Sequence, residues 1–147
     1  MTGPVEAGPA KVNAVEVGAQ AEEREFGPLT IREFVRYAGA SGDLNPIHYD
    51  PDFAHQAGYP TVFSQGMHQA ALLATYATGW LGVTTLRRYQ VRFRDQVWPG
   101  DSLRCSGVIT AVTPAGPQTF VTVELRAVTS AGKLALTGEA DFVIPSA

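Results

Sequence analysis

The chain has 147 residues, of which 45% are hydrophobic and 17% charged, a composition typical of one soluble globular domain. Its formal net charge of -3 gives no basic footprint for nucleic-acid binding. A single cysteine, Cys105, excludes an intramolecular disulfide and disfavours a zinc site built on cysteines.

No targeting or membrane-spanning segment is evident in the sequence. The first ten residues lack a basic region followed by an apolar run, so we expect no signal peptide. No uncharged stretch is apolar enough to span a bilayer. We therefore expect a cytoplasmic protein with no membrane partner.

The N-terminal part of the chain predicts two short helices. Residues 1–14, rich in glycine, alanine and proline, are expected to be the flexible end of a single domain spanning 1–147. A short strand before residue 27 leads to a helix with Thr30 as N-cap and Glu33 completing a capping box. That helix should stop within residues 39–42. A second helix should begin at Pro51, because proline is favoured at the first helical position, and run to about residue 57.

The middle of the chain has an unusual lack of charge. Residues 53–86 contain no Asp, Glu, Lys or Arg. Within them, residues 65–81 have apolar side chains at helical spacing, with small residues between. A helix without a charged face is enclosed on nearly all sides. We therefore expect the rest of the chain to wrap around this helix.

The C-terminal half predicts four strands with alternating apolar and polar residues. Because their connections are short, we expect these consecutive strands to form an antiparallel meander. Helices precede strands, which predicts an α+β fold with a curved sheet around the apolar helix. Cys105 lies in one of these strands and is expected to be buried and inert. The strands are expected at residues 88–94, 103–111, 121–127 and 134–144, with turns at 98–101, 113–117 and 130–133.

Residues 41–48, Ser-Gly-Asp-Leu-Asn-Pro-Ile-His, place a carboxylate, a carboxamide and an imidazole in one short turn. Asp43 and His48 are suited to share a proton transfer, because histidine titrates near neutrality. The alternative is structural, since Asp and Asn in a turn commonly bond to backbone groups. The position of both groups just before the charge-free segment favours acid–base chemistry on a small substrate.

Ser64-Gln65-Gly66 is the second candidate element. If Ser64 caps the central helix, the backbone N–H of Gly66 has no partner within the helix and points from its positive end. Such an N–H stabilises a developing oxyanion, and glycine lets a carbonyl group approach closely. The alternative is that Ser64 only caps the helix and Gly66 only relieves crowding. The two interpretations are compatible.

Other residues give weaker signals. His55 and His68, with nearby aspartates, could suggest a metal site, but no H-E-x-x-H or comparable spacing occurs, so we expect no metal. No G-x-S-x-G, G-x-G-x-x-G or Walker sequence is present, which disfavours serine hydrolases and nucleotide enzymes. A set of arginines is expected on a solvated sheet face, with contact to cofactor phosphates as the less favoured use. These arginines are Arg87, Arg88, Arg92, Arg94 and Arg104.

Residues 37–48, Gly66-Met67 and residues 97–101 together resemble the MaoC-like (R)-specific enoyl-CoA hydratases and dehydratases, also called hydratase 2. The resemblance covers most of the chain after residue 20. It implies a hotdog fold, in which a long antiparallel sheet wraps a central helix. It also implies that Asp43 and His48 activate a water that adds to a trans-2-enoyl thioester, giving an (R)-3-hydroxyacyl thioester reversibly.

The same resemblance implies roles for further residues. Asn45 would orient the catalytic groups or the water, and the Gly66 N–H would bind the thioester oxygen. No metal or redox cofactor is implied, because the CoA or carrier-protein thioester is the substrate. Phe63, Gln65 and His68 differ from the residues common in relatives, and with Met67 they form the expected substrate-binding set. Fatty-acid or steroid side-chain metabolism is the implied context.

An open edge strand is commonly covered by another chain, so we expect a homodimer or a heterodimer with another hotdog subunit. Two alternatives to the active hydratase remain. One is an acyl-thioester-binding or partner subunit of a hetero-oligomeric dehydratase, and the other is a hotdog thioesterase. The intact Asp43 and His48 pair favours the active hydratase.

Overall fold

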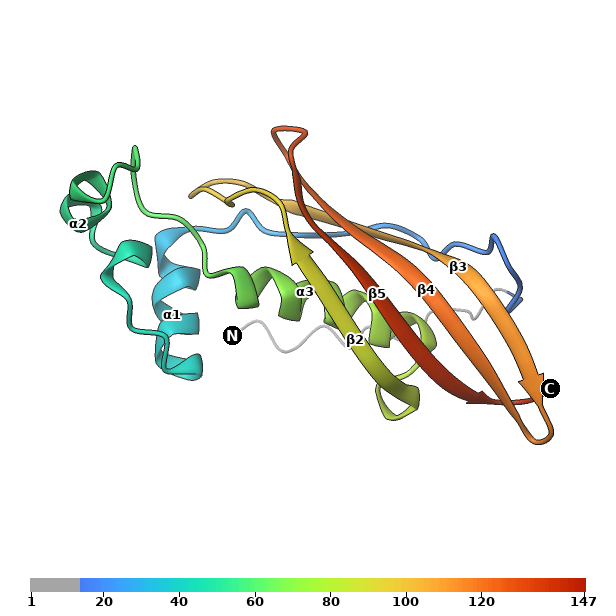
Figure 1. The fold of residues 1–147 in the computed structure, drawn as a ribbon. Coiled ribbons are helices and arrows are strands. Elements are labelled where there is room, and N and C mark those ends of the chain that lie inside the picture. Colours follow the sequence, from blue (N-terminus) through green and yellow to red (C-terminus); the bar gives the residue numbers. More distant parts are fainter. Residues whose placement is uncertain (1–13) are drawn as a thin grey trace, which may run out of the picture.

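The computed structural model describes residues 14–147 as a five-stranded antiparallel sheet curved around one long helix (Figure 1). Residues 1–13, most of the expected flexible end, lie outside the described part. The predicted α+β hotdog architecture is confirmed. The elements are β1 (Arg24–Phe26), α1 (Ile31–Ser41), the 3-10 helix η1 (Pro46–His48), α2 (Pro51–Gln56), α3 (Gly66–Leu81), the 3-10 helix η2 (Val83–Thr85), β2 (Leu86–Phe93), β3 (Leu103–Ala115), β4 (Gln118–Thr129) and β5 (Leu134–Pro145).

The strand order corrects the predicted meander. The order is β1-β3-β4-β5-β2, so β3, β4 and β5 are consecutive neighbours but β2 pairs with β5, with Tyr89 opposite Ala140. Alternation of side chains determines which face of a strand is buried and not which strand lies beside it. Residues 94–102 consequently connect β2, at one edge of the sheet, to β3, which lies beside the opposite edge strand β1, instead of closing a hairpin.

The turn predicted at residues 113–117 is also shorter than expected. β3 continues to Ala115 and β4 begins at Gln118, which leaves only Gly116 and Pro117 in the turn. Pro114 is tolerated within β3 because β1 pairs only with residues 103–105, so this end of β3 lies at a sheet edge.

Local signals place the two N-terminal helices as predicted. The Glu33 carboxylate accepts the Thr30 backbone N–H at 2.9 Å, so the expected capping box starts α1. α1 ends at Gly42, whose φ of 78° is costly for residues with a Cβ. The Asp50 carboxylate accepts backbone N–H groups of residues 52 and 53 and starts α2 at Pro51.

α3 packs closely on the inner face of the sheet, where Leu125 stands between Gly107 and Gly138 of the neighbouring strands. A Cβ on Gly107 would lie 2.8 Å from Leu125 Cδ2 and 3.3 Å from Trp80 Cζ3. A Cβ on Gly138 would lie 3.3 Å from Leu73 Cδ2. These two glycines therefore make the space that lets α3 approach the sheet.

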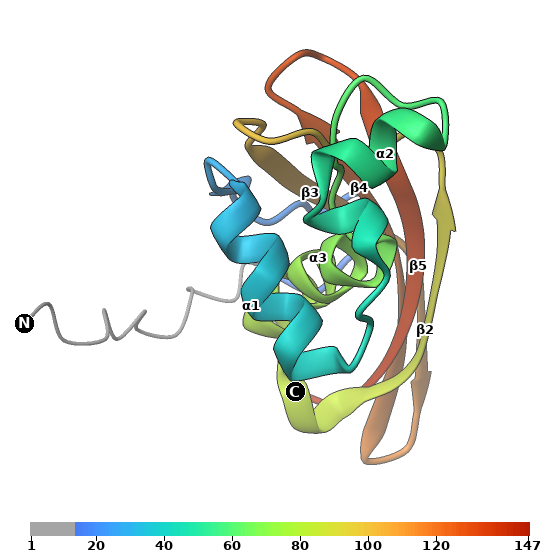
Figure 2. The same cartoon turned by 90° about the vertical axis from the view of Figure 1, so that its left-hand side faces the viewer.

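The expectation that α3 is enclosed on nearly all sides is wrong for the single chain. Figure 2 shows α3 end-on, with the sheet curving past it. Met67, Ala71, Thr75 and Gly79, spaced by one helical turn, remain exposed, and the Met67 side chain is 61% exposed. We call these four residues the α3 stripe. The sheet covers only the opposite side of the helix, which leaves an uncharged face in contact with solvent.

Cys105 lies on β3 and is fully buried, as predicted. Burial raises the pKa of its thiol to about 12, so the thiolate form is disfavoured at neutral pH. This supports an inert, space-filling role for the side chain.

Candidate active site

Asp43 and His48 face each other across the turn that joins α1 to α2, with His48 Nε2 3.6 Å from Asp43 Oδ2. Asn45 shapes this turn, because its Oδ1 accepts the Ile47 N–H at 3.1 Å and caps η1, which ends at His48. The other Asp43 oxygen, Oδ1, accepts the Asn45 N–H at 3.3 Å. Asp43 Oδ1 and Asn45 Oδ1 thus stabilise the turn, as the structural interpretation expects, while Asp43 Oδ2 and His48 form the pair of the functional interpretation.

The His48 ring is held in one orientation by the backbone. Its Nδ1 lies 2.7 Å from the Phe63 carbonyl oxygen. Because a carbonyl oxygen only accepts, Nδ1 carries the proton and Nε2 of the neutral ring is left as an acceptor. His48 is 8% exposed, whereas the Asp43 side chain is 46% exposed. The acceptor nitrogen therefore faces a carboxylate at the border between protein and solvent.

Gly66 is the first residue of α3, and Gln65, not Ser64, occupies the N-cap position. Ser64 is buried, and its N–H donates to the Val97 carbonyl at 2.9 Å. Within residues 14–147, no side chain caps the first turn of α3. The His68 N–H donates to the Gln65 carbonyl at 3.1 Å, which leaves the backbone N–H groups of Gly66 and Met67 for another acceptor. The absence of a serine cap therefore strengthens the anion-binding character of the helix start.

Glycine at position 66 is favoured by space and not by backbone conformation. A Cβ there would lie 3.0 Å from Cε1 of the Phe93 ring. A hollow of about 300 Å³ adjoins Gly66, and neither Asp43 nor His48 lines it. Its walls are formed by Phe63, Ser64, Gly66, Gln69, Phe93, Arg94, Asp95 and Gln96.

Phe63 joins the two parts of the site. Its carbonyl oxygen contacts His48 Nδ1, and its ring meets the His48 ring edge-on with the centroids 5.4 Å apart. The same side chain lines the hollow beside Gly66. The acid–base pair and the helix start are therefore connected through one residue.

The other three expected substrate contacts lie elsewhere. Gln65 is 1% exposed, and its Nε2 donates to the Phe34 carbonyl at 2.9 Å, so its side chain is directed toward α1. Met67 belongs to the α3 stripe. His68 stacks on Tyr37 with the centroids 4.7 Å apart, and burial lowers the pKa of its imidazole. Of the four, only Phe63 lines the hollow with Gly66.

The structure adds Gln69 and Phe93 to the candidate site. Gln69 lines the hollow and is 2% exposed, and its Oε1 has no hydrogen-bond partner within residues 14–147. Buried polar atoms are normally paired, so this oxygen is unusual. A signal for it was present in the sequence, since residue 69 lies one helical turn after Gly66 on the buried face of α3.

Other site classes find little support in the described residues. Residues 14–147 hold no group of three or more His, Cys, Asp or Glu side chains arranged to bind a metal. His55 is exposed, and its Nε2 lies 2.7 Å from the Pro60 carbonyl oxygen. None of the helices in the described part is long and apolar enough to cross a membrane.

Comparison with known proteins gives consistent matches. The family model described as "MaoC like domain" matches residues 12–131. The (R)-specific enoyl-CoA hydratase of Aeromonas caviae is 31% identical over 139 residues, which cover 90% of this chain and 97% of that protein. The fatty acid synthase subunit beta of Gibberella zeae is 35% identical over 94 residues, which cover 62% of this chain and only 5% of that protein.

Solved structures match over nearly the whole chain. The (R)-hydratase from A. caviae has a TM-score of 0.69 at 30% identity, and the match covers 87% of this chain and 96% of that one. The ChsH1–ChsH2 complex from Mycobacterium tuberculosis has a TM-score of 0.78 at 22% identity, with 90% and 100% covered. The second likeness concerns the fold alone.

Proposed function

The chain belongs to the MaoC-like family, and from that premise we propose that it is a hydro-lyase that reversibly hydrates trans-2-enoyl thioesters to (R)-3-hydroxyacyl thioesters. The observation that carries the proposal is the acceptor Nε2 of His48, held 3.6 Å from Asp43 Oδ2. This separation is longer than a direct hydrogen bond, so both atoms can contact one water oxygen. The substrate is an acyl thioester of CoA or of a carrier protein.

In the hydration direction, Asp43 and His48 position a water against the β-carbon of the enoyl group. His48 Nε2 takes one proton from the water as its oxygen bonds to the β-carbon, and Asp43 stabilises the resulting imidazolium. The electron pair of the double bond moves toward the thioester oxygen, which accepts a hydrogen bond from the Gly66 N–H at the start of α3. The imidazolium then returns the proton to the α-carbon, so the water is fully consumed. Asn45 acts as a positioning residue through its cap on η1.

The chemistry requires only protein groups and water, so we propose no metal or redox cofactor. We further propose that a second hotdog chain, identical or related, completes the acyl site. Two features support a partner: β2 leaves one sheet edge unpaired, and the α3 stripe is exposed without charge. They adjoin each other, since the Tyr89 hydroxyl on β2 donates to the Ala70 carbonyl beside the stripe at 2.6 Å.

The test is hydration of crotonyl-CoA and of a longer enoyl-CoA, followed as loss of enoyl-thioester absorbance. Asp43→Asn and His48→Ala should each lower kcat by about 10²- to 10⁴-fold, because each removes a proton-transfer partner. Asp52→Asn, an exposed charge removal on α2, is the matched control and should retain wild-type kcat. Activity that survives the double variant would refute the mechanism. Release of free CoA, detected with a thiol reagent, would instead indicate a thioesterase.

A further inference from the structure

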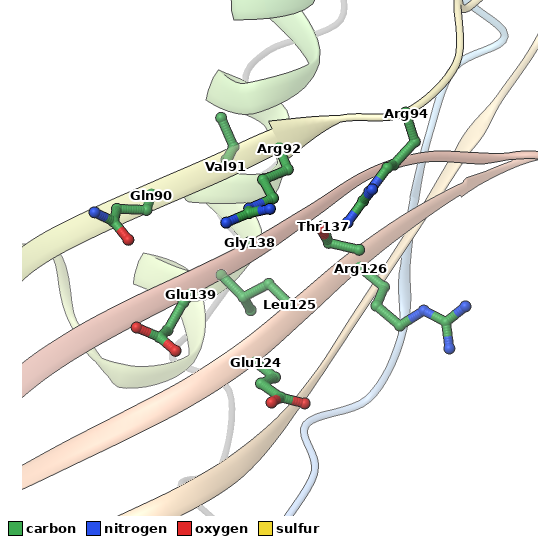
Figure 3. A pocket seen from close by; sticks show the side chains of 10 residues that line it. All are labelled: Gln90, Val91, Arg92, Arg94, Glu124, Leu125, Arg126, Thr137, Gly138 and Glu139. Atoms are coloured by element: carbon green, nitrogen blue, oxygen red, sulfur yellow. The ribbon is translucent and has the colours of Figure 1, made fainter.

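A second hollow, of about 730 Å³, lies on the outer face of the sheet, away from α3 (Figure 3). Cross-strand pairing places Thr137 of β5 directly between Arg92 of β2 and Arg126 of β4. We call these three residues the arginine row. Side chains alternate between the two faces of a strand, and the Gly138 position faces α3. Its neighbour Thr137 therefore points outward, as do its cross-strand partners Arg92 and Arg126.

The positive charge of the row is not neutralised within the described chain. Arg92, Arg94 and Arg126 are exposed, and none forms an ion pair or a side-chain hydrogen bond with another residue of 14–147. Two carboxylates line the same hollow, Glu124 and Glu139. Glu139 is held by Arg88 at 2.7 Å, and Glu124 forms no ion pair with the row. The row therefore presents guanidinium groups on the outer face of the sheet, with donors that no residue of 14–147 uses, on a chain whose net charge is -3. In Figure 3 Arg92 and Arg94 approach Thr137, whereas the Arg126 side chain extends away from it.

Arg94 connects this face to the candidate active site. It lines both the outer hollow and the hollow beside Gly66. Figure 3 shows Arg92 and Arg94 directed from β2 and its end toward β5. A thioester handle bound beside Gly66 would therefore have to run along Arg94 to reach the arginine row.

We propose that the arginine row, with Arg94, binds the phosphate groups of a coenzyme A handle, an inference that rests on the function proposed above. Arginine forks match phosphate oxygens with paired hydrogen bonds, and the Thr137 hydroxyl adds a donor between them. A carrier protein offers the same arm, but the volume of the hollow is that of a small-molecule site. The nucleotide end of coenzyme A is therefore the occupant to which the row is suited.

The test compares the double variant Arg92→Gln/Arg126→Gln with a control that removes two exposed arginines of α1, Arg32→Gln/Arg36→Gln. Calorimetric titration with free coenzyme A should give a Kd raised about tenfold or more in the row variant, because charge-assisted hydrogen bonds to phosphate are lost. The ratio of kcat/KM for crotonyl-CoA to that for the phosphate-free crotonyl N-acetylcysteamine thioester should fall by a similar factor. The control should keep the wild-type Kd and ratio.

An unchanged Kd for coenzyme A, or an equal loss with both thioesters, would overturn the inference. A further alternative is that this face is an interface between copies of the chain. Light scattering tests it, because a change of molecular mass in the row variant would indicate such an interface and would also overturn the phosphate site. Binding is measured without turnover. If the wild-type protein does not hydrate enoyl thioesters but the row variant binds coenzyme A more weakly than the wild type, the phosphate site is supported and the proposed function is refuted.

Discussion

Asn45 links the turn chemistry to the catalytic pair, because its side-chain oxygen holds the 3-10 helix that ends at His48. Asn45→Ala should lower kcat for crotonyl-CoA with a smaller effect on KM, and should lower the free energy of unfolding by about 1 kcal/mol. Asn45→Ser keeps a side-chain acceptor at the cap and should restore most of the kcat and most of the free energy of unfolding. Loss of stability without loss of kcat would contradict a positioning role.

His68 should make stability depend on pH. Burial lowers its folded-state pKa below the ordinary 6.5, so the unfolded chain binds more protons than the folded one in that region. The free energy of unfolding should therefore be fully present above about pH 6.5 and fall as the pH drops through the lowered pKa. Urea unfolding at pH 7.5 and pH 5 should show this decrease in the wild type, and His68→Phe, which keeps the stack on Tyr37, should reduce it. His55→Gln, a change on exposed α2, should leave the decrease intact.

The sequence indicated Asp43, His48 and Gly66 as candidates because their residue types and spacing suit a mechanism, and their catalytic roles stay a prediction. The structure places Asp43 and His48 opposite each other and Gly66 at the start of α3. The expected substrate contact of Gln65 was not met, because its amide donates to the carbonyl of Phe34, which is distant in the sequence. Helical spacing alone does not show which element covers a given side of a helix. Gln69 was overlooked although it lies one helical turn after Gly66, because that spacing alone does not show which side of α3 borders the hollow.

The contact between α3 and the sheet depends on the small residues that flank Leu125. Gly107→Ala should lower the free energy of unfolding by about 1–3 kcal/mol, because the new Cβ would meet Leu125 and Trp80 in a packed core. Gly39→Ala in α1 is the matched control. Apart from its chain neighbours and the backbone of its own helix, no atom lies within 4 Å of its added Cβ, and alanine should stabilise the helix by about 0.5–1 kcal/mol. Equal effects of the two substitutions in chemical denaturation would contradict the packing argument.

Helices and strands were predictable where particular residue types mark their ends or their buried face. The capping box at Thr30, Pro51 after Asp50, and the alternation in the C-terminal strands all formed as expected. The position of β2 beside β5 was not predictable, because pairing between strands distant in sequence depends on how α3 lies across the sheet. The missing charge on α3 was interpreted as full enclosure, although an exposed face reserved for another chain gives the same pattern.

The whole molecule is expected to associate through β2 and the α3 stripe. Light scattering should give a mass of two chains, or a multiple of two, since pairing covers the sheet edge and the uncharged face together. Ala71→Glu places a charge on the stripe and should shift the mass toward one chain. Val35→Glu adds the same charge on exposed α1 and should not. A one-chain mass for the wild type would rule out self-association and leave a related subunit as the partner.

Phe63 has a consequence for how the molecule would distinguish between acyl groups. Its ring borders the hollow, while its carbonyl sets which nitrogen of His48 carries the proton. An acyl group too wide for the hollow would displace the ring and, with it, the backbone oxygen. The imidazole would then lose its fixed tautomer although the thioester remained bound. Selectivity in such an arrangement would be expressed in the rate of turnover more than in affinity, so that an ill-fitting substrate would behave as an inhibitor.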